Sequence, residues 1–209
     1  MVVSDLDHPK EDRNPLGFSV KMKVSLLYTP STVGHSMARS DSFFIRAQLT
    51  GLTGGAAGFD TSAIDLGAFV DALGKTVLRI HNVSVQYTFG ANVAPALAAA
   101  NSEGLVSWQL TTQDQTGMVD ANNRSVISSG ALVAGNSSVV ANTLTFITDS
   151  IDVAPQHWEN GYLVAVESLQ LAGKASSTFR DLCDVSIVLE CTVETMTQAA
   201  AMALALSQQ

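Results

Sequence analysis

The chain has 209 residues, of which 46% are hydrophobic and 14% are charged, and its formal net charge is −8. This hydrophobic fraction is enough for a folded core, which excludes intrinsic disorder over most of the chain. The acidic excess and the scattered basic residues exclude strong nucleic-acid binding through neutralised phosphates.

Residues 1–17 are predicted to form an extended arm, because the segment is polar, contains Pro9 and Pro15 and shows no hydrophobic periodicity. No basic stretch is followed by an apolar one, so no signal peptide is expected. Such an arm is either disordered or lies on a neighbouring subunit. It lacks the arginine-rich composition of arms that bind a genome.

From residue 18 onward, hydrophobic and polar residues alternate, which predicts β-strands. The first predicted strand is FSVKMKVSLLY (18–28), in which Lys21 and Lys23 share a solvated face. A second strand is predicted at SFFIRAQL (42–49).

A glycine-rich loop, GLTGGAAGFDTS (51–62), is predicted next, without the glycine spacing of a nucleotide-binding loop. Residues 64–74 fit either a short helix or an irregular edge segment. Gly67 and the Phe69-Val70 pair weaken the helical pattern.

The later predicted strands are rich in β-branched and aromatic residues, and turn-rich loops separate them. They are 76–89, 105–112, a short strand around Val126 and Ile127, 142–148, 162–171 and 183–195. About eight strands without alternating helices predict an all-β protein, an antiparallel β-sandwich of jelly-roll or Greek-key type.

The tail, residues 196–209, is rich in good helix formers. It is predicted to form a short terminal helix that packs on the sandwich or on a neighbour. Its apolar stretch is shorter than the roughly 20 residues that a membrane span requires. The predicted organisation is therefore an arm (1–17), a sandwich (18–195) and a tail (196–209).

Cys183 and Cys191 fall eight residues apart in one predicted strand. In a straight strand their Cα atoms are roughly 26 Å apart, which is too far for a disulfide. Two buried or half-buried free thiols are expected, with no metal site between them.

The string Gly74-Lys75-Thr76 resembles the end of a phosphate-binding loop. However, Phe69 stands where that loop requires glycine, and a strand follows instead of a helix. A turn is therefore expected.

Four histidines lie far apart in sequence, without metal-ligand spacing: His8, His35, His81 and His157. His81 is expected to be a hydrogen-bonded structural residue in a strand. His35 has Ser36 and Asp41 nearby, but no nucleophile-elbow motif supports a catalytic trio.

Two carboxylate pairs frame loops and fit calcium ligation by their oxygen atoms: Asp149 with Asp152, and Asp181 with Asp184. Neither has the spacing of a calcium-binding loop, so no metal site is predicted.

The two tryptophans allow a sugar-stacking platform, formed by Trp108 with Trp158. The favoured interpretation places Trp108 in the core. Trp158 then anchors its own loop or an inter-subunit contact.

The strand series from FSVKMKVSLL to DVSIVLECTV, together with the terminal extensions, resembles viral coat proteins of the single jelly-roll type across residues 18–195. The resemblance implies a self-assembling capsid protein of the virion, not an enzyme, without cofactor or metal. Its subunits would meet through the sandwich sides and the terminal extensions. The implied partners are other copies and possibly a second coat protein. The missing basic arm fits a shell whose inner surface meets a lipid layer or other proteins.

Two other classes remain open at this point. An extracellular lectin-like or adhesin module would have a shallow site centred on Trp158. A cupin-like enzyme would need clustered His and Glu ligands in its strands, where only His81 stands in a clear strand.

Overall fold

The computed structural model describes residues 41–53, 58–71, 74–91, 93–150 and 158–209. The predicted arm (1–17) and the predicted strand at 18–28 lie outside these residues. The described residues all belong to one compact unit, Ala38–Gln209.

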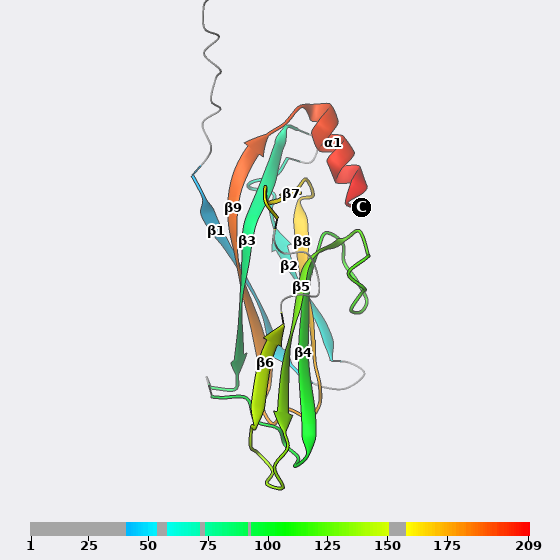
Figure 1. The fold of residues 1–209 in the computed structure, drawn as a ribbon. Coiled ribbons are helices and arrows are strands. Elements are labelled where there is room, and N and C mark those ends of the chain that lie inside the picture. The colour runs from blue at the N-terminus through cyan, green and yellow to red at the C-terminus, as the bar shows by residue number, and fades with distance from the viewer. Residues whose placement is uncertain (1–40, 54–57, 72–73, 92, 151–157) are drawn as a thin grey trace, which may run out of the picture. The chain divides into compact units, whose positions relative to one another are not determined.

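Nine strands and one helix are present in the described part of the chain (Figure 1). They are β1 (Phe43–Leu52), β2 (Phe59–Asp65), β3 (Thr76–Phe89), β4 (Ser102–Thr111), β5 (Val126–Asn136), β6 (Phe146–Ser150), β7 (Tyr162–Val164), β8 (Ser168–Ala175), β9 (Cys183–Thr195) and α1 (Gln198–Ser207).

The strands form two antiparallel sheets, with the orders β1-β9-β3-β7 and β2-β8-β4-β5-β6. With β6 set aside, β1 pairs with β9, β2 with β8, β3 with β7, and β4 with β5. A long antiparallel hairpin wrapped in this way into two sheets is a jelly roll. The predicted jelly-roll sandwich is confirmed, and β6 is an additional edge strand.

The core lies between the two sheets and is built by alternation along the strands. In β9, every second residue from Cys183 to Cys191 is buried. Trp108 of β4 is also in this core, as predicted, and its indole Nε1 donates a hydrogen bond to the Tyr87 hydroxyl at 3.0 Å. The interior of the sandwich is thus apolar, and its tryptophan N–H is satisfied.

The region around β2 differs from the prediction. Residues 59–62 form part of β2 instead of a loop, because pairing with β8 supports an edge strand with little alternation of its own. The described residues after it form a single turn, in which the Leu66 carbonyl accepts hydrogen bonds from the N–H groups of Phe69 and Val70. The helical alternative for 64–74 is therefore wrong, and the irregular alternative is correct.

The predicted single strand at 162–171 is also wrong, because the segment contains two strands in different sheets. β7 belongs to the four-stranded sheet and β8 to the five-stranded sheet. Residues 165–167 cross between them. Both strands supply buried residues to the sandwich, and only Glu167 and Ser168 separate their apolar residues, so the sequence resembles one strand.

Several strand boundaries also differ. β4 begins at Ser102, β5 extends to Asn136, and β6 begins only at Phe146. The glycines and serines of β5 obscure its length in the sequence, and its strand character comes from pairing on both sides, with β4 and β6.

The tail forms the predicted helix, α1, which is capped by the Thr197 hydroxyl accepting from the Ala200 N–H at 3.3 Å. Ala201 and Ala205 pack with Val77 and Ala165 in a second small core cluster. The helix therefore packs on its own sandwich. In the described ranges, no helix has the length and apolar character needed to cross a membrane.

Candidate interaction surfaces

The polar motifs of the sequence occupy ordinary structural positions. Gly74 and Lys75 immediately precede β3, which begins at Thr76, so the string occupies the position expected of a turn. His81 lies at an irregularity of β3 where the register with β9 shifts, and its Nε2 is 2.9 Å from the Thr192 hydroxyl. This confirms a hydrogen-bonded strand histidine.

The other histidines, His8, His35 and His157, lie outside the described residues, as does Ser36.

The carboxylates of the second Asp pair already have protein partners. Asp184 Oδ1 accepts a hydrogen bond from the Gly51 N–H at 2.7 Å. Asp181 Oδ2 accepts from Arg180, with its Nη2 at 2.6 Å. Asp184 thus joins the ends of β9 and β1, while Asp181 pairs with its neighbour in the loop before β9.

The first pair is only half described, since Asp152 lies outside the described residues. Asp149 lies near Tyr87, and burial, followed by the charge of Asp149, raises the pKa of that tyrosine. Over the part of the chain that the structure describes, no group of three or more His, Cys, Asp or Glu is placed to hold a metal ion.

Trp108 is only 1% exposed, so the favoured interpretation of this residue as core is confirmed and the alternative of a tryptophan platform is excluded. Trp158 is half-buried and packs against the core and against the Tyr162 ring, with centroids 5.6 Å apart. This packing matches the interpretation of Trp158 as a loop anchor.

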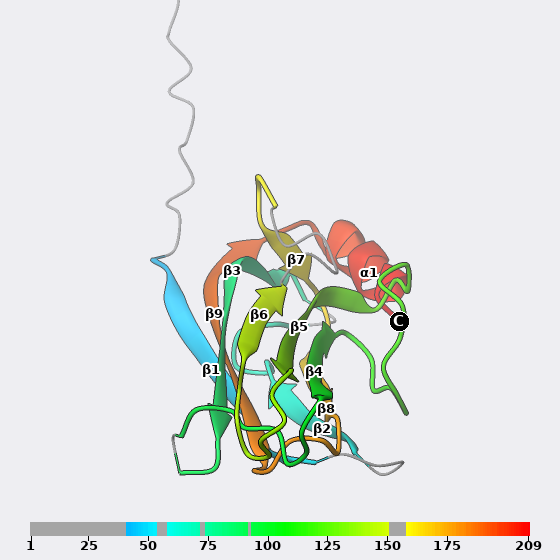
Figure 2. The same ribbon diagram turned by 60° about the horizontal axis from the view of Figure 1, so that its bottom comes forward.

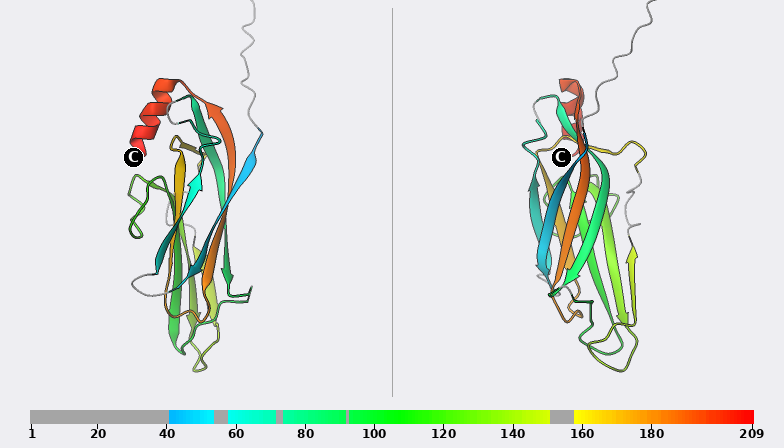
Figure 3. Two further views of the ribbon diagram at one scale, coloured as in Figure 1. Left: turned by 180° about the vertical axis from the view of Figure 1, so that it is seen from behind. Right: turned by 90° about the vertical axis from the view of Figure 1, so that its left-hand side faces the viewer.

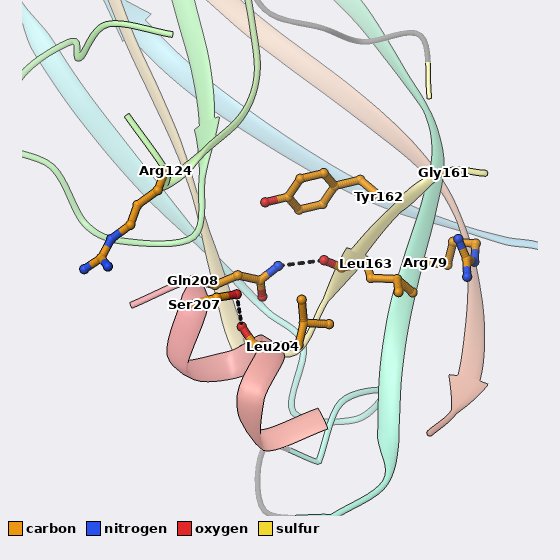
Figure 4. A pocket seen from close by; sticks show the side chains of 8 residues that line it. All are labelled: Arg79, Arg124, Gly161, Tyr162, Leu163, Leu204, Ser207 and Gln208. Atoms are coloured by element: carbon orange, nitrogen blue, oxygen red, sulfur yellow. Dashed lines mark hydrogen bonds between the residues drawn. The ribbon is translucent and has the colours of Figure 1, made fainter. Parts of the chain in front are cut away.

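A shallow hollow of about 350 Å³ lies beside α1 (Figure 4). It is lined by Arg79, Arg124, Gly161, Tyr162, Leu163, Leu204, Ser207 and Gln208. Arg79 binds the Glu194 carboxylate through two hydrogen bonds, one of them 2.7 Å long, and also donates to the Asn160 carbonyl. The charge of this arginine is therefore compensated inside the protein.

Gln208, at the edge of the hollow, closes a sheet edge. Its Nε2 donates to the Leu163 carbonyl at 2.6 Å, and its Oε1 accepts from the Ala165 N–H at 3.0 Å. Its backbone carbonyl accepts from the Thr112 hydroxyl at 2.7 Å. One side-chain amide thus takes the place of a further strand beside β7. Sequence reasoning missed this residue, because a glutamine near a helix end is ordinarily solvated.

Three loops meet at one end of the sandwich, and their described residues are 90–91 with 93–101, 137–145 and 176–182 (Figure 2). Backbone hydrogen bonds join them. The Asn142 N–H donates to the Leu97 carbonyl at 2.9 Å, and the Ala98 N–H donates to the Thr178 carbonyl at 2.8 Å. These loops, which we call the apolar end, therefore form one connected surface.

The apolar end has almost no charge. The sequences of its three loops contain one cation and one anion, Arg180 and Asp181, which bind each other. It nevertheless exposes large hydrophobic side chains: Val93 (44%), Val139 (86%), Val140 (57%) and Leu182 (55%). Several exposed apolar side chains on one almost uncharged surface fit an interaction site.

The tip of this surface is held in place by Asn136, which is buried at the end of β5. Its Nδ2 donates to the carbonyls of Ala99 and Val140, and its Oδ1 accepts from the Ser138 N–H and the Thr143 hydroxyl. The valines are therefore presented on a preorganised loop, which lowers the entropic cost of binding.

No family model matches the chain, and no curated protein matches it. A solved chain from Desmodium yellow mottle tymovirus aligns with 90% of this chain and 95% of its own length. The TM-score is 0.28 and the sequence identity is 11%. The jelly-roll assignment rests on the strand order of this chain itself.

Proposed function

We propose that this protein is a structural subunit that self-assembles into a viral capsid shell. Its subunits would meet through the end and sides of the sandwich and through the terminal segments. The observation that carries the proposal is the apolar end, an almost uncharged surface with exposed valines on a loop that Asn136 holds in place.

The composition of this surface supports burial against other subunits. The buried cores of protein interfaces are depleted in charged residues. A monomer that stays in solution normally keeps exposed loops polar, because water solvates them. Jelly rolls occur in capsids, in lectins and in cupins, so the fold alone does not choose among these functions. The apolar end is the feature that favours self-assembly over the other two functions.

The proposed partners follow from the same features. Other copies of the chain are the main partner, and a second coat protein is compatible with the same surface. With a net charge of −8, the chain is not expected to bind the genome strongly and directly. Contact with an internal lipid layer is a further part of this proposal.

Electron microscopy of the purified protein tests the proposal most directly. Closed shells or regular lattices are expected. A uniform monomer of 21.9 kDa would contradict the proposal, and glycan binding by that monomer would favour a lectin-like or adhesin module instead.

A pair of substitutions tests the surface itself. Replacing Val139→Asp and Val140→Asp places two charges on the apolar end, and assembly should be lost while the thermal unfolding of the sandwich is unchanged. The matched control is Ala121→Asp with Asn122→Asp, which adds the same charge to exposed residues of the loop between β4 and β5. If the valine variant assembles as well as the control variant does, the apolar end is not the interface.

A further inference from the structure

The two sheets have four edge strands: β1 and β7 in one sheet, β2 and β6 in the other (Figure 3). An exposed edge carries unpaired backbone N–H and C=O groups, and another strand can pair with them. Folded proteins usually guard such edges with charges, bulges, proline or a covering segment. The four edges of this sandwich differ in how they are guarded.

Side chains guard two of the edges, one by hydrogen bonds to the edge backbone and the other by charges on the edge strand. The edge of β7 is closed by the amide of Gln208 (Figure 4). The edge strand β2 has two exposed carboxylates, Asp60 and Asp65, and that of Asp60 accepts a hydrogen bond from the Thr61 N–H at 2.8 Å. Neither strand offers a free, uncharged edge.

The edge of β1 is guarded by a cation and an irregularity. Arg46 is exposed at the middle of the strand, with its guanidinium 5.8 Å from the centre of the Phe44 ring. The register with β9 shifts between Leu49 and Leu52, where Gly51 has a φ of +73°. A second strand would therefore meet a charge and a bent end.

β6 is the least guarded of the four edges. Its sequence, FITDS, contains no proline and no cation, its one charged group is the exposed carboxylate of Asp149, and its five residues pair with β5 in unbroken register. Across the described residues, no strand pairs with its outer edge. Phe146 (45% exposed) and Ile147 (48%) are consecutive, so they project from opposite faces of the strand. Large apolar groups are thus exposed on both sides of an open edge.

We propose that β6 pairs in antiparallel fashion with β6 of a second copy across a two-fold axis, which joins two five-stranded sheets into one continuous sheet. This inference rests on the proposed self-assembly, because it takes a second copy as the partner. An identical edge is the natural partner, since a two-fold contact uses the same surface on both subunits.

The register follows from the length and charge of β6. In a two-fold antiparallel pair, one residue lies opposite its own copy on the axis. With Thr148 in that position, all five residues of β6 are paired and Asp149 lies opposite Ile147 of the second copy. Placing Asp149 on the axis would set two carboxylates directly opposite each other, which destabilises a sheet.

Cysteine cross-linking tests this pairing. Both native cysteines are buried, so Thr148→Cys introduces an exposed thiol that has no accessible rival. Directly opposite residues of antiparallel strands have Cα atoms about 4.5–5.5 Å apart, within disulfide reach. Mild oxidation should convert the Thr148→Cys protein into a covalent dimer on a non-reducing gel. The control is Ala63→Cys, an exposed position on the guarded edge strand β2, which should stay monomeric.

The outcomes separate this inference from the proposed function. Shells seen by microscopy without the Thr148 cross-link, or equal cross-linking at Ala63, would overturn the β6 pairing and leave the capsid proposal standing. A cross-linked dimer that never forms shells would support the pairing and contradict the capsid. A monomer without cross-links would contradict both.

Discussion

Gln208 closes the four-stranded sheet with a single side chain. It is 3% exposed, and its amide satisfies one donor and one acceptor beside β7. If the amide is removed, the carbonyl of the half-buried Leu163 and the N–H of the buried Ala165 lose their partners. A buried polar group without a partner costs about 1–3 kcal/mol.

The substitution Gln208→Ala should therefore lower the free energy of unfolding by about 2 kcal/mol, measured by urea denaturation. Gln209→Ala is the matched control, because the neighbouring Gln209 is exposed, and it should leave stability unchanged. Equal stability of the two variants would mean that water replaces the amide at no cost.

The two thiols should make stability depend on alkaline pH. Burial, together with the charges of Asp184 and Glu190, raises the pKa of Cys183 and of Cys191 to about 12 from 9.0. The folded protein therefore holds these protons more tightly than the unfolded chain does. The contribution of the two protonated thiols to the free energy of unfolding is fully present below about pH 9. It falls as the pH rises toward about 12, by at most about 1.4 kcal/mol per pH unit for each thiol.

Urea midpoints measured at about pH 8 and about pH 10 check this dependence. The fall between the two should be smaller in the Cys183→Ala and Cys191→Ala variants, whose side chains do not ionise. An unchanged fall in both variants would assign the alkaline sensitivity to other groups, such as Tyr87.

The burial of individual residues was predictable where they lie in a strand with a clear alternating pattern. The burial of Cys183, Cys191 and Trp108 follows from alternation along strands whose character is clear in the sequence. The role of Gln208 was not predictable, because it depends on backbone groups more than 40 residues away.

At the scale of elements, β4 begins where two loops pack against it. Gly104 lies beneath Leu97 and Phe179, and a Cβ atom there would be 2.8 Å from each side chain. Leu97 is fully buried and its position is fixed by the loop hydrogen bonds of the apolar end. The strand can therefore approach these loops only with glycine at this position.

Gly104→Ala is accordingly expected to destabilise the sandwich by about 1–3 kcal/mol, because overpacking forces neighbouring side chains to move. The control is Gly117→Ala, where no atom lies within 4 Å of the added Cβ. Thermal unfolding followed by circular dichroism compares them. A neutral Gly104→Ala would show that Leu97 and Phe179 move freely.

Elements were predictable to the extent that their own residues alternate. β3 and β9 match the predicted ranges, since both are long strands rich in β-branched residues. β2 was missed and β7 was merged with β8. β2 is a strand because it pairs with β8, and β7 and β8 are separate strands because the chain crosses from one sheet to the other between them. Neither leaves a local pattern in the sequence.

For the whole molecule, the fold class was predictable and the surface was not. The number of strands and the lack of helical patterns indicate a two-sheet sandwich, which the strand order confirms as a jelly roll. The apolar end is assembled from three loops that are separated by whole strands. Each loop is unremarkable in sequence, and only the fold shows that the uncharged residues share one surface.

The position of β9 also governs how the protein can be made. It is the last strand in chain order, yet it lies between β1 and β3, with Phe43 opposite Cys191 and Thr76 opposite Thr195. Until a ribosome has released β9, the two earlier strands lack the neighbour that joins them. Contacts between residues so distant in sequence form slowly. The four-stranded sheet therefore completes only after β9 has been synthesised, and a nascent chain that stalls earlier exposes two long strand edges that are prone to aggregation.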